Sequence, residues 1–190
     1  MIRAIIFDCF GVLYHGSLSY MRELAGSAHR AQLDDASKAF DYGYITHDEY
    51  LAQLTDITGL SRDEITVIRA KYHVRNELLI EYVRELRQTY KIGLLSNIGS
   101  DSFYGELFTR DEVTELFDEV VLSSDIHIVK PQPEAFLSIA ERLGVPPEEC
   151  VMIDDLSDNV AGARAVSMIG VQYNSIEQLR GELEGILNHA

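Results

Sequence analysis

Five short apolar runs along the chain have the pattern of buried β-strands. They are residues 4–7, 92–95, 117–122, 150–153 and 169–173. The first and fourth are unbroken, as expected of strands covered on both faces. Helical patterns are found near 76–89, 134–143 and 157–167 and from Ser175 onward. Strands alternating with helices of these lengths predict an α/β fold, with a parallel sheet and helices on both faces.

Residues 17 to about 73 have a different hydrophobic pattern, with helical periodicity and no convincing strand. Two helix starts are well marked, because residues 46–49 and 61–64 both have the capping-box form, and Gly59 closes the helix between them. The all-helical block therefore reads as an insertion between the first and second strands. We expect an α/β core of residues 1–15 and 76–190 and a helical insertion of residues 16–75.

Composition narrows the functional classes. The chain has 190 residues, of which 46% are hydrophobic and 25% charged, and its formal net charge is −15. Such an acidic balance argues against binding to nucleic acid or to an anionic membrane, and no apolar stretch is long enough to span a bilayer. The short N-terminal apolar run leads straight into Asp8, so we expect no signal peptide and a cytoplasmic location. Cys9 and Cys150 have no metal-site spacing and read as small buried hydrophobes.

Polar side chains follow the predicted core strands. Asp8, Ser96, Asn97, Asp154 and Asp155 lie at strand carboxyl ends, Asn159 lies one helical turn further on, and Lys130 follows the third strand. Taken singly, each has a structural explanation as a helix cap, a turn residue or a solvated loop lysine. Together they place three carboxylates, a hydroxyl, an amide and an ammonium at one edge of a sheet, where ligands bind. Crowded carboxylates need a cation, hard oxygen ligands favour Mg²⁺, and the other groups suit a phosphate.

The same segments resemble the four motifs of the haloacid dehalogenase superfamily, which consists mostly of magnesium-dependent phosphatases. Asp8-Cys9-Phe10-Gly11-Val12 is similar to the first motif, Ser96-Asn97 to the second, Lys130-Pro131 to the third, and Asp154-Asp155 with Asn159 to the fourth. Residues 43–50 are similar to the cap of the subgroup that contains sugar-phosphate phosphatases and the phosphatase domain of epoxide hydrolases. The resemblance implies a Rossmann-like core, with the helical insertion as a small cap after the first strand.

The resemblance also assigns roles. Asp8 would attack the phosphoryl group of a small phosphorylated metabolite and form an aspartyl-phosphate. Mg²⁺ would be held by Asp8, Asp154, Asp155 and the backbone carbonyl of Phe10. Ser96, Asn97 and Lys130 would bind the phosphoryl oxygens, with Ser96 and Lys130 counted as catalytic, and Asn159 would orient the metal-binding acids from behind.

Phe10 departs from the usual phosphatase pattern, in which a second aspartate protonates the leaving group. Losing a general acid costs about 10² to 10⁴ in rate. Three interpretations stay open: a phosphatase for good leaving groups or with another proton source, a metal-independent 2-haloacid dehalogenase, or a catalytically silent binding protein. The acid pair Asp154-Asp155 counts against dehalogenation, because it would be costly without a cation.

Other polar residues of the insertion receive no role. His15 is a candidate for the missing acid, but a solvent-exposed histidine is the simpler interpretation. Arg22, Arg69 and Arg75 are expected on solvated helix faces, and His47 and His73 show no ligand spacing.

Overall fold

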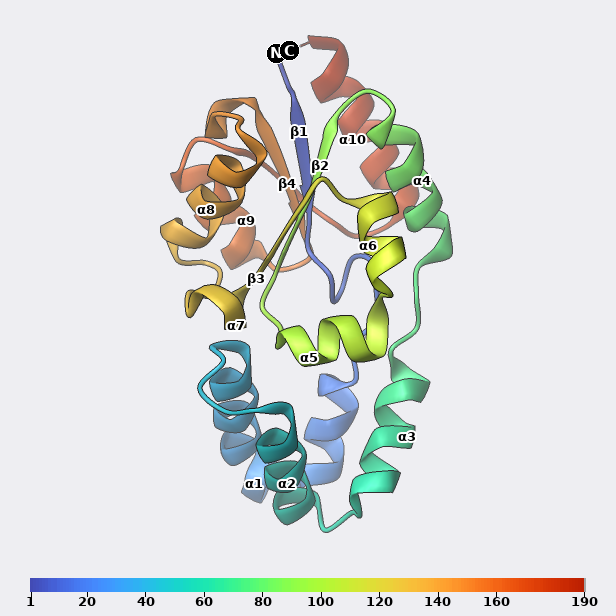
Figure 1. Ribbon diagram of the computed structural model, residues 1–190, viewed down its shortest axis with the longest axis vertical. Helices are drawn as coiled ribbons and strands as arrows, with labels where there is room; N and C mark the ends of the chain where they lie inside the picture. Colours follow the sequence, from blue (N-terminus) through green and yellow to red (C-terminus); the bar gives the residue numbers. More distant parts are fainter. Residues whose placement is uncertain (190) are drawn as a thin grey trace.

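A parallel sheet forms the centre of the molecule (Figure 1). The computed structural model describes residues 1–189, so residue 190 of the expected core segment lies outside the described part. Within it, the strands are β1 (Ala4–Phe7), β2 (Lys91–Ser96), β3 (Glu119–Leu122), β4 (Cys150–Asp154) and β5 (Ile169–Gln172). Their order is β3-β2-β1-β4-β5, and every neighbouring pair is parallel. The predicted α/β class is confirmed.

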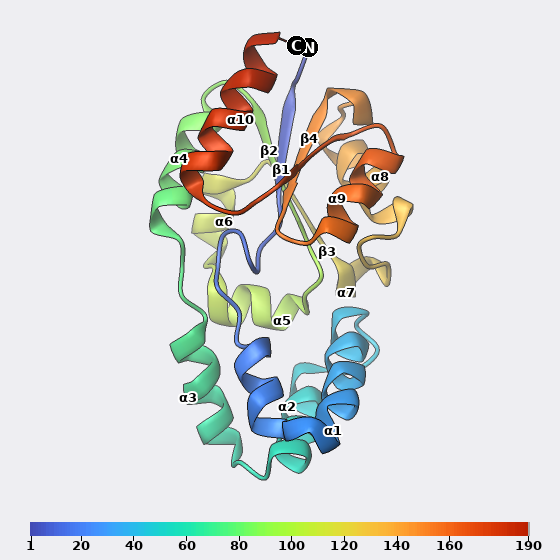
Figure 2. The ribbon, with the colours of Figure 1, turned by 180° about the vertical axis from the view of Figure 1, so that it is seen from behind.

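Helices cover both faces of the sheet (Figures 1 and 2). They are α4 (Glu77–Arg87) and α10 (Ile176–His189) on one face, and α8 (Pro133–Leu143) and α9 (Ser157–Ala165) on the other. The central strand β1 alternates between them: Ile5 and Phe7 belong to one buried cluster, Ala4 and Ile6 to the other. β1 is buried along its whole length, which explains why its sequence is an unbroken apolar run.

The helical insertion after β1 forms a cap with its own core. Its helices are α1 (Leu18–Asp41), α2 (His47–Thr58) and α3 (Arg62–Tyr72). A separate buried cluster unites the three, with Met21, Phe40, Leu54 and Ile65 among its members. Both predicted capping boxes are present, at the starts of α2 and α3. α1 is broken at Gly26, whose φ of 66° is readily adopted only by glycine.

Several short elements have no counterpart in the sequence-based prediction. They are α5 (Ser100–Ser102), the π-helical turn η1 (Phe103–Leu107), α6 (Arg110–Leu116), α7 (Ser123–Ile126) and the 3₁₀ turn η2 (Pro147–Glu149). Because Phe117 terminates α6, β3 begins at Glu119, two residues later than predicted. No helix within residues 1–189 is long and apolar enough to cross a membrane.

Candidate active site

The carboxyl ends of the three central strands bring the predicted site residues together. Asp8 directly follows β1, Ser96 ends β2, and Asp154 ends β4. β1 pairs with β2 on one side and with β4 on the other, so these positions are neighbours. Oxygens of Asp8, Asp154 and Asp155 lie within 4.8 Å of one another. The sequence prediction that these acids gather at one edge of the sheet is therefore met by the geometry.

Lys130 lies between two of these acids. Its ammonium is 2.8 Å from Asp8 Oδ1 and 2.6 Å from Asp154 Oδ2, and its side chain is only 1% exposed. Burial lowers the pKa of Lys130, but Asp8 and Asp154 outweigh that effect and raise it above its usual value. Lys130 is therefore a buried permanent cation. It balances only one of the three carboxylates.

Asp154 and Asp155 have different environments although they are adjacent. Asp154 is fully buried, and both of its oxygens accept hydrogen bonds from Asn159 Nδ2, at 3.0 and 3.1 Å. The Leu156 backbone N–H donates a further bond to Asp154 Oδ1. Asp155 is half-buried, and burial together with the Asp154 charge raises its pKa. Asp154 is thus held rigidly by the protein, while Asp155 has oxygens available for a cation.

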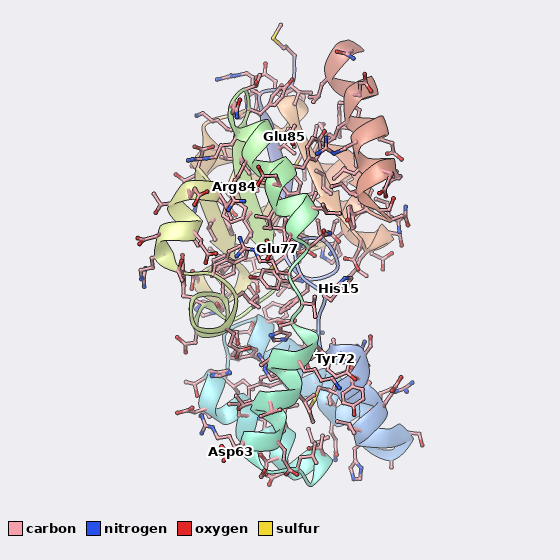
Figure 3. All side chains as sticks on the ribbon, turned by 90° about the vertical axis from the view of Figure 1, so that its right-hand side faces the viewer. His15, Asp63, Tyr72, Glu77, Arg84 and Glu85 are labelled. Atoms are coloured by element: carbon pink, nitrogen blue, oxygen red, sulfur yellow. The ribbon has the colours of Figure 1, made fainter. Side chains whose placement is uncertain are left out.

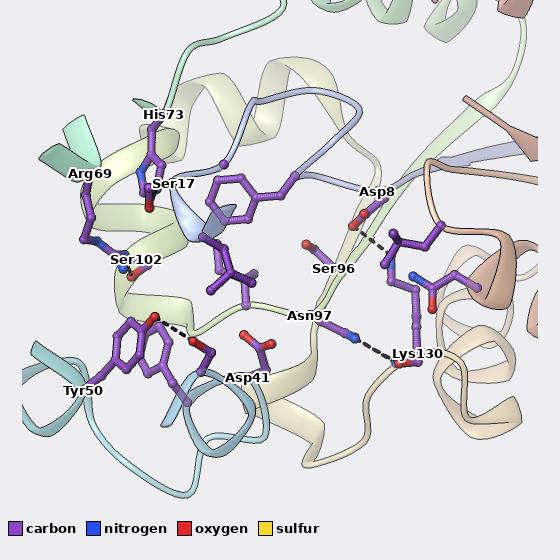
Figure 4. A pocket seen from close by; sticks show the side chains of 18 residues that line it. Asp8, Ser17, Asp41, Tyr50, Arg69, His73, Ser96, Asn97, Ser102 and Lys130 are labelled. Atoms are coloured by element: carbon purple, nitrogen blue, oxygen red, sulfur yellow. Dashed lines mark hydrogen bonds and ion pairs between the residues drawn. The ribbon is translucent and has the colours of Figure 1, made fainter. Parts of the chain in front are cut away.

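Asn97 anchors the segment that carries Lys130. The Asn97 amide donates to the Lys130 carbonyl oxygen at 3.0 Å, and its own oxygen accepts the Lys130 N–H at 2.8 Å. This exchange fixes the loop after α7 against the end of β2, and Figure 4 shows it beside the Asp8–Lys130 pair. Ser96 is 1% exposed and lines the same cavity. Asn97 therefore positions Lys130 in addition to facing the cavity.

Asp8 lines a cavity of about 250 Å³ between the sheet and the cap. Core residues Asp8, Ser96, Asn97, Lys130 and Asn159 line one part. Cap residues Ser37, Phe40, Asp41, Tyr50 and Arg69 line the other part, as Figure 4 shows for those it labels. The cavity holds both the predicted phosphate-binding groups and a cap wall of polar and aromatic side chains.

Burial raises the pKa of Asp8 to about 6, with the Asp154 charge acting in the same direction and Lys130 against it. A second carboxyl in the cavity, Asp41, has a larger shift. Burial raises its pKa to about 8, and the charge of Asp8 adds to this while Lys130 opposes it. The cavity therefore disfavours additional negative charge until a cation enters it.

Phe10 stands at the position where the usual phosphatase pattern has a second acid. Its ring lines the cavity and lies 5.0 Å from the His73 ring, centroid to centroid. Gly11 follows with a φ of +87°, and a Cβ at this position would overlap the Asp155 carboxylate. His15 is exposed at the junction of cap and core and does not line the cavity (Figure 3). The simpler interpretation of His15 therefore holds.

The expectation that Arg69 lies on a solvated helix face is wrong. Arg69 is 7% exposed, and its Nη2 donates to Ser102 Oγ and to both oxygens of Glu106, each at 3.1 Å. His47 and His73 also contact Glu106, at 2.9 and 3.3 Å. Burial raises the pKa of Glu106, but these three partners outweigh it and lower the pKa well below its ordinary value. Cap and core are joined by one ionic cluster, which the sequence did not reveal because Glu106 lies in an unpredicted segment.

Arg22 and Arg75 lie away from the cavity among the described residues. Arg22 pairs with Asp34 at 2.7 Å, and Arg75 pairs with Glu112 at 2.5 Å. Cys9 is completely buried in the core, as predicted, and does not line the cavity.

Comparison with known proteins identifies the family. A profile of the haloacid dehalogenase-like hydrolases matches residues 2–167. The chain belongs to this family. The matched range contains the cap and every strand-end segment described above, so this membership covers the whole candidate site of the hydrolase.

Three individual proteins illustrate the similarity. Glyceraldehyde 3-phosphate phosphatase of Methanopyrus kandleri is 34% identical, over 90% of this chain and 84% of its own length. Drimenol cyclase drtB of Aspergillus calidoustus is 25% identical over 98% of this chain, but the chain spans only 37% of that protein. A haloacid dehalogenase family enzyme of Bacteroides thetaiotaomicron, solved with magnesium and inorganic phosphate, has a TM-score of 0.77 at 22% identity, covering 93% of this chain and 96% of its own. At that identity the solved structure supports the fold.

Proposed function

We propose that this hydrolase is a magnesium-dependent phosphatase that cleaves a small phosphorylated metabolite through an aspartyl-phosphate. The observation that carries the proposal is the buried Asp8–Lys130–Asp154 arrangement, with Asp155 beside it, where Asp8 and Lys130 line the cavity between core and cap. The group combines a nucleophile, a fixed cation and an excess of carboxylates. A phosphoryl group is stabilised by such charge complementarity and positioning.

Asp8 is the proposed nucleophile. Lys130 lies 2.8 Å from its Oδ1, so we assign the attack on phosphorus to Oδ2. A carboxylate is needed for this attack, and a pKa of about 6 keeps a useful fraction ionised at neutral pH. Lys130 would also offset the negative charge that builds on the phosphoryl oxygens in the transition state. Ser96 and Asn97, at the end of β2, would bind those oxygens by hydrogen bonds.

The residues present fit Mg²⁺. Three carboxylates share one ammonium. Gly11 has no side chain, and a Cβ at this position would overlap the Asp155 carboxylate, so the glycine keeps this side of Asp155 open. Hard oxygen donors without nearby thiolates or imidazoles are the ligands that Mg²⁺ prefers. Asp8, Asp155, Asp154 and the backbone carbonyl of Phe10 would hold the ion, and Asn159 would orient Asp154 from behind. A bound ion would supply further positive charge to the phosphoryl group.

The size of the cavity supports a small substrate. About 250 Å³ accommodates a phosphoryl group with a short carbon chain or a small sugar. The 34% identical relative acts on glyceraldehyde 3-phosphate, and residues 43–50 resemble the cap of sugar-phosphate phosphatases. Both support a small sugar phosphate or triose phosphate. The cap, residues 16–75, would then close over the substrate and exclude water.

Phe10 gives one reason to keep a 2-haloacid dehalogenase as the second candidate, because a halide leaving group needs no proton. The acid pair Asp154-Asp155 argues against a dehalogenase. Burial and the charge of Asp154 raise the pKa of Asp155, so a bound cation would stabilise the ionised pair. A silent binding protein on the same fold is the third candidate. Metal-dependent phosphate release would distinguish the phosphatase from the other two candidates, and halide release would distinguish those two from each other.

The test measures phosphate released from 4-nitrophenyl phosphate and from a panel of small sugar phosphates, with Mg²⁺ and with EDTA. We expect turnover only with Mg²⁺, and its loss in Asp8→Asn. Asp158→Asn, an exposed aspartate near the start of α9, is the matched control and should keep wild-type activity. Halide release from a 2-haloacid in EDTA would establish the dehalogenase, and no turnover of any substrate would favour the binding protein.

A further inference from the structure

The phosphatase proposal needs a proton donor, because Phe10 cannot protonate the leaving group. Several titratable groups line the cavity besides Asp8: Asp41, Tyr50, Arg69, His73 and Lys130. Most of them are committed to other contacts. Lys130 is held between two carboxylates, and Arg69 is bound to Glu106.

Tyr50 and His73 are also engaged. Tyr50 OH is 3.0 Å from Ser37 Oγ, and burial raises its pKa above the ordinary value, which makes it a poorer acid. His73 places Nε2 3.2 Å from Ser17 Oγ and Nδ1 3.3 Å from Glu106, so both ring nitrogens face protein groups. Neither side chain is free to turn toward a substrate.

Asp41 is different. Among the described residues its carboxyl group makes no hydrogen bond and no ion pair, although it faces the cavity (Figure 4). It is the last residue of α1, so the negative end of the helix dipole also disfavours its ionised form. The charged and titratable groups that act on it from other elements are Asp8, Lys130 and Tyr50. Burial and the charge of Asp8 raise the Asp41 pKa to about 8 against the opposing effect of Lys130, so the group carries its proton at neutral pH.

The backbone at Asp41 is fixed against the core. Ser123 Oγ donates to the Asp41 carbonyl oxygen, and His127 Nδ1 is 2.8 Å from the Tyr42 carbonyl oxygen. Gly43 then passes so close to α7 that a Cβ would lie 2.6 Å from the Ser124 carbonyl oxygen. These contacts fix the end of α1, on the side of the cap that faces the sheet. A catalytic side chain needs to be held in position in this way.

We propose that Asp41 is the general acid of this enzyme and takes over, from the cap, the role that position 10 cannot fill. The inference rests on the proposed phosphatase function. As Asp8 Oδ2 bonds to phosphorus, the bond from phosphorus to the bridging oxygen breaks, and that oxygen takes its electron pair and the Asp41 proton to leave as an alcohol. Asp41 is then a carboxylate. It accepts a proton from the water that attacks the aspartyl-phosphate, the bond from phosphorus to Asp8 breaks, and both carboxyl groups return to their starting states.

The test compares two substrates that differ in their need for an acid. Glycerol phosphate releases an alkoxide unless it is protonated, whereas 4-nitrophenyl phosphate releases a stable phenolate. We expect Asp41→Asn to reduce kcat/KM for glycerol phosphate by about 10² to 10⁴ and for 4-nitrophenyl phosphate by less than about tenfold. The fall of the wild-type glycerol phosphate rate at alkaline pH should disappear in the variant. Asp35→Asn, at an exposed position of the same helix, should leave both substrates unaffected.

Each other result has a definite meaning. Equal losses for the two substrates, or none, would overturn the role of Asp41 and leave the phosphatase intact. Wild-type hydrolysis of 4-nitrophenyl phosphate without any hydrolysis of glycerol phosphate would also overturn it, because no group would then be protonating alkoxides. A wild-type protein inactive on both substrates with Mg²⁺ would refute the proposed function itself. Circular dichroism of Asp41→Asn separates these results from misfolding.

Discussion

Replacing Lys130 with methionine would remove the cation from between two buried carboxylates and keep a side chain of similar length. Lys130 lies 2.8 Å from Asp8 and 2.6 Å from Asp154, and Asp154 is fully buried. Removing one partner of a buried ion pair costs about 3 to 5 kcal/mol, because the remaining charge is uncompensated. Asp8 can relieve part of this cost by binding a proton. We therefore expect the free energy of unfolding to fall by about 3 kcal/mol at pH 8 and by less at pH 5.

The sign of this pH dependence follows from the pKa of Asp8. It is already raised to about 6, and the loss of Lys130 removes an influence that lowers it, so it rises further. The folded variant then retains a proton that the unfolded chain releases as the pH rises, and its stability declines over that interval. Urea unfolding followed by circular dichroism, in EDTA at pH 5 and pH 8, measures the difference. A loss below about 1 kcal/mol at pH 8, or an equal loss at both pH values, would show that Lys130 does not compensate the charges of Asp8 and Asp154.

Lys38→Met is the matched control, because Lys38 is exposed on α1 and makes no ion pair among the described residues. It should change the free energy of unfolding by less than about 0.5 kcal/mol. Added Mg²⁺ should stabilise Lys130→Met more than the wild type, since the ion meets the same carboxylates without their competing ammonium. Equal stabilisation of the two proteins would contradict an ion bound at this cluster.

Three further outcomes follow from the site. Gly11→Ala places a Cβ over the Asp155 carboxylate at a positive φ, so the Mg²⁺ concentration for half-maximal thermal stabilisation should rise by about tenfold, and an unchanged titration would argue against Asp155 as a ligand. Arg69→Met removes the arginine that binds Glu106 between cap and core. The free energy of unfolding should fall by about 2 kcal/mol in urea titrations, and KM should rise. No change in either quantity would mean that the cluster does not hold the cap against the core. The Asp41 carboxyl has a pKa of about 8 in the folded protein against about 4 in the unfolded chain, so stability falls between these pH values, by up to about 5 kcal/mol at pH 8. Asp41→Asn should remove that fall and be more stable than the wild type at pH 8, and parallel pH profiles of the two proteins would contradict the shift.

The strands that carry the site could be predicted because they are buried on both faces. β1 and β4 read as unbroken apolar runs, and the polar residues after them mark the edge of the sheet. The segment from Ser100 to Leu116 escaped prediction because α5 and η1 are too short to show periodicity. One signal was present: Thr109 and Glu112 have the same capping-box form that marked α2 and α3, and the structure shows that box at the start of α6.

The cap residues that line the cavity could not be predicted from the sequence, for a physical reason. Arg69 looks like any arginine of an amphipathic helix, and its burial depends on Glu106, 37 residues away in the chain. Asp41 looks like a polar residue at a helix end. Its significance comes from facing Asp8 and Lys130, which belong to other elements, and such long-range electrostatics has no local signature.

The proposed mechanism depends on phosphorylation of Asp8. The most direct measurement is the mass of the peptide containing Asp8 after rapid acid quenching of the enzyme during turnover of 4-nitrophenyl phosphate with Mg²⁺. We expect a peptide heavier by one phosphoryl group, which hydroxylamine removes. This heavier peptide should be absent in EDTA and in Asp8→Asn. Steady turnover without any phosphorylated Asp8 peptide, or phosphate release that persists in Asp8→Asn, would contradict this mechanism.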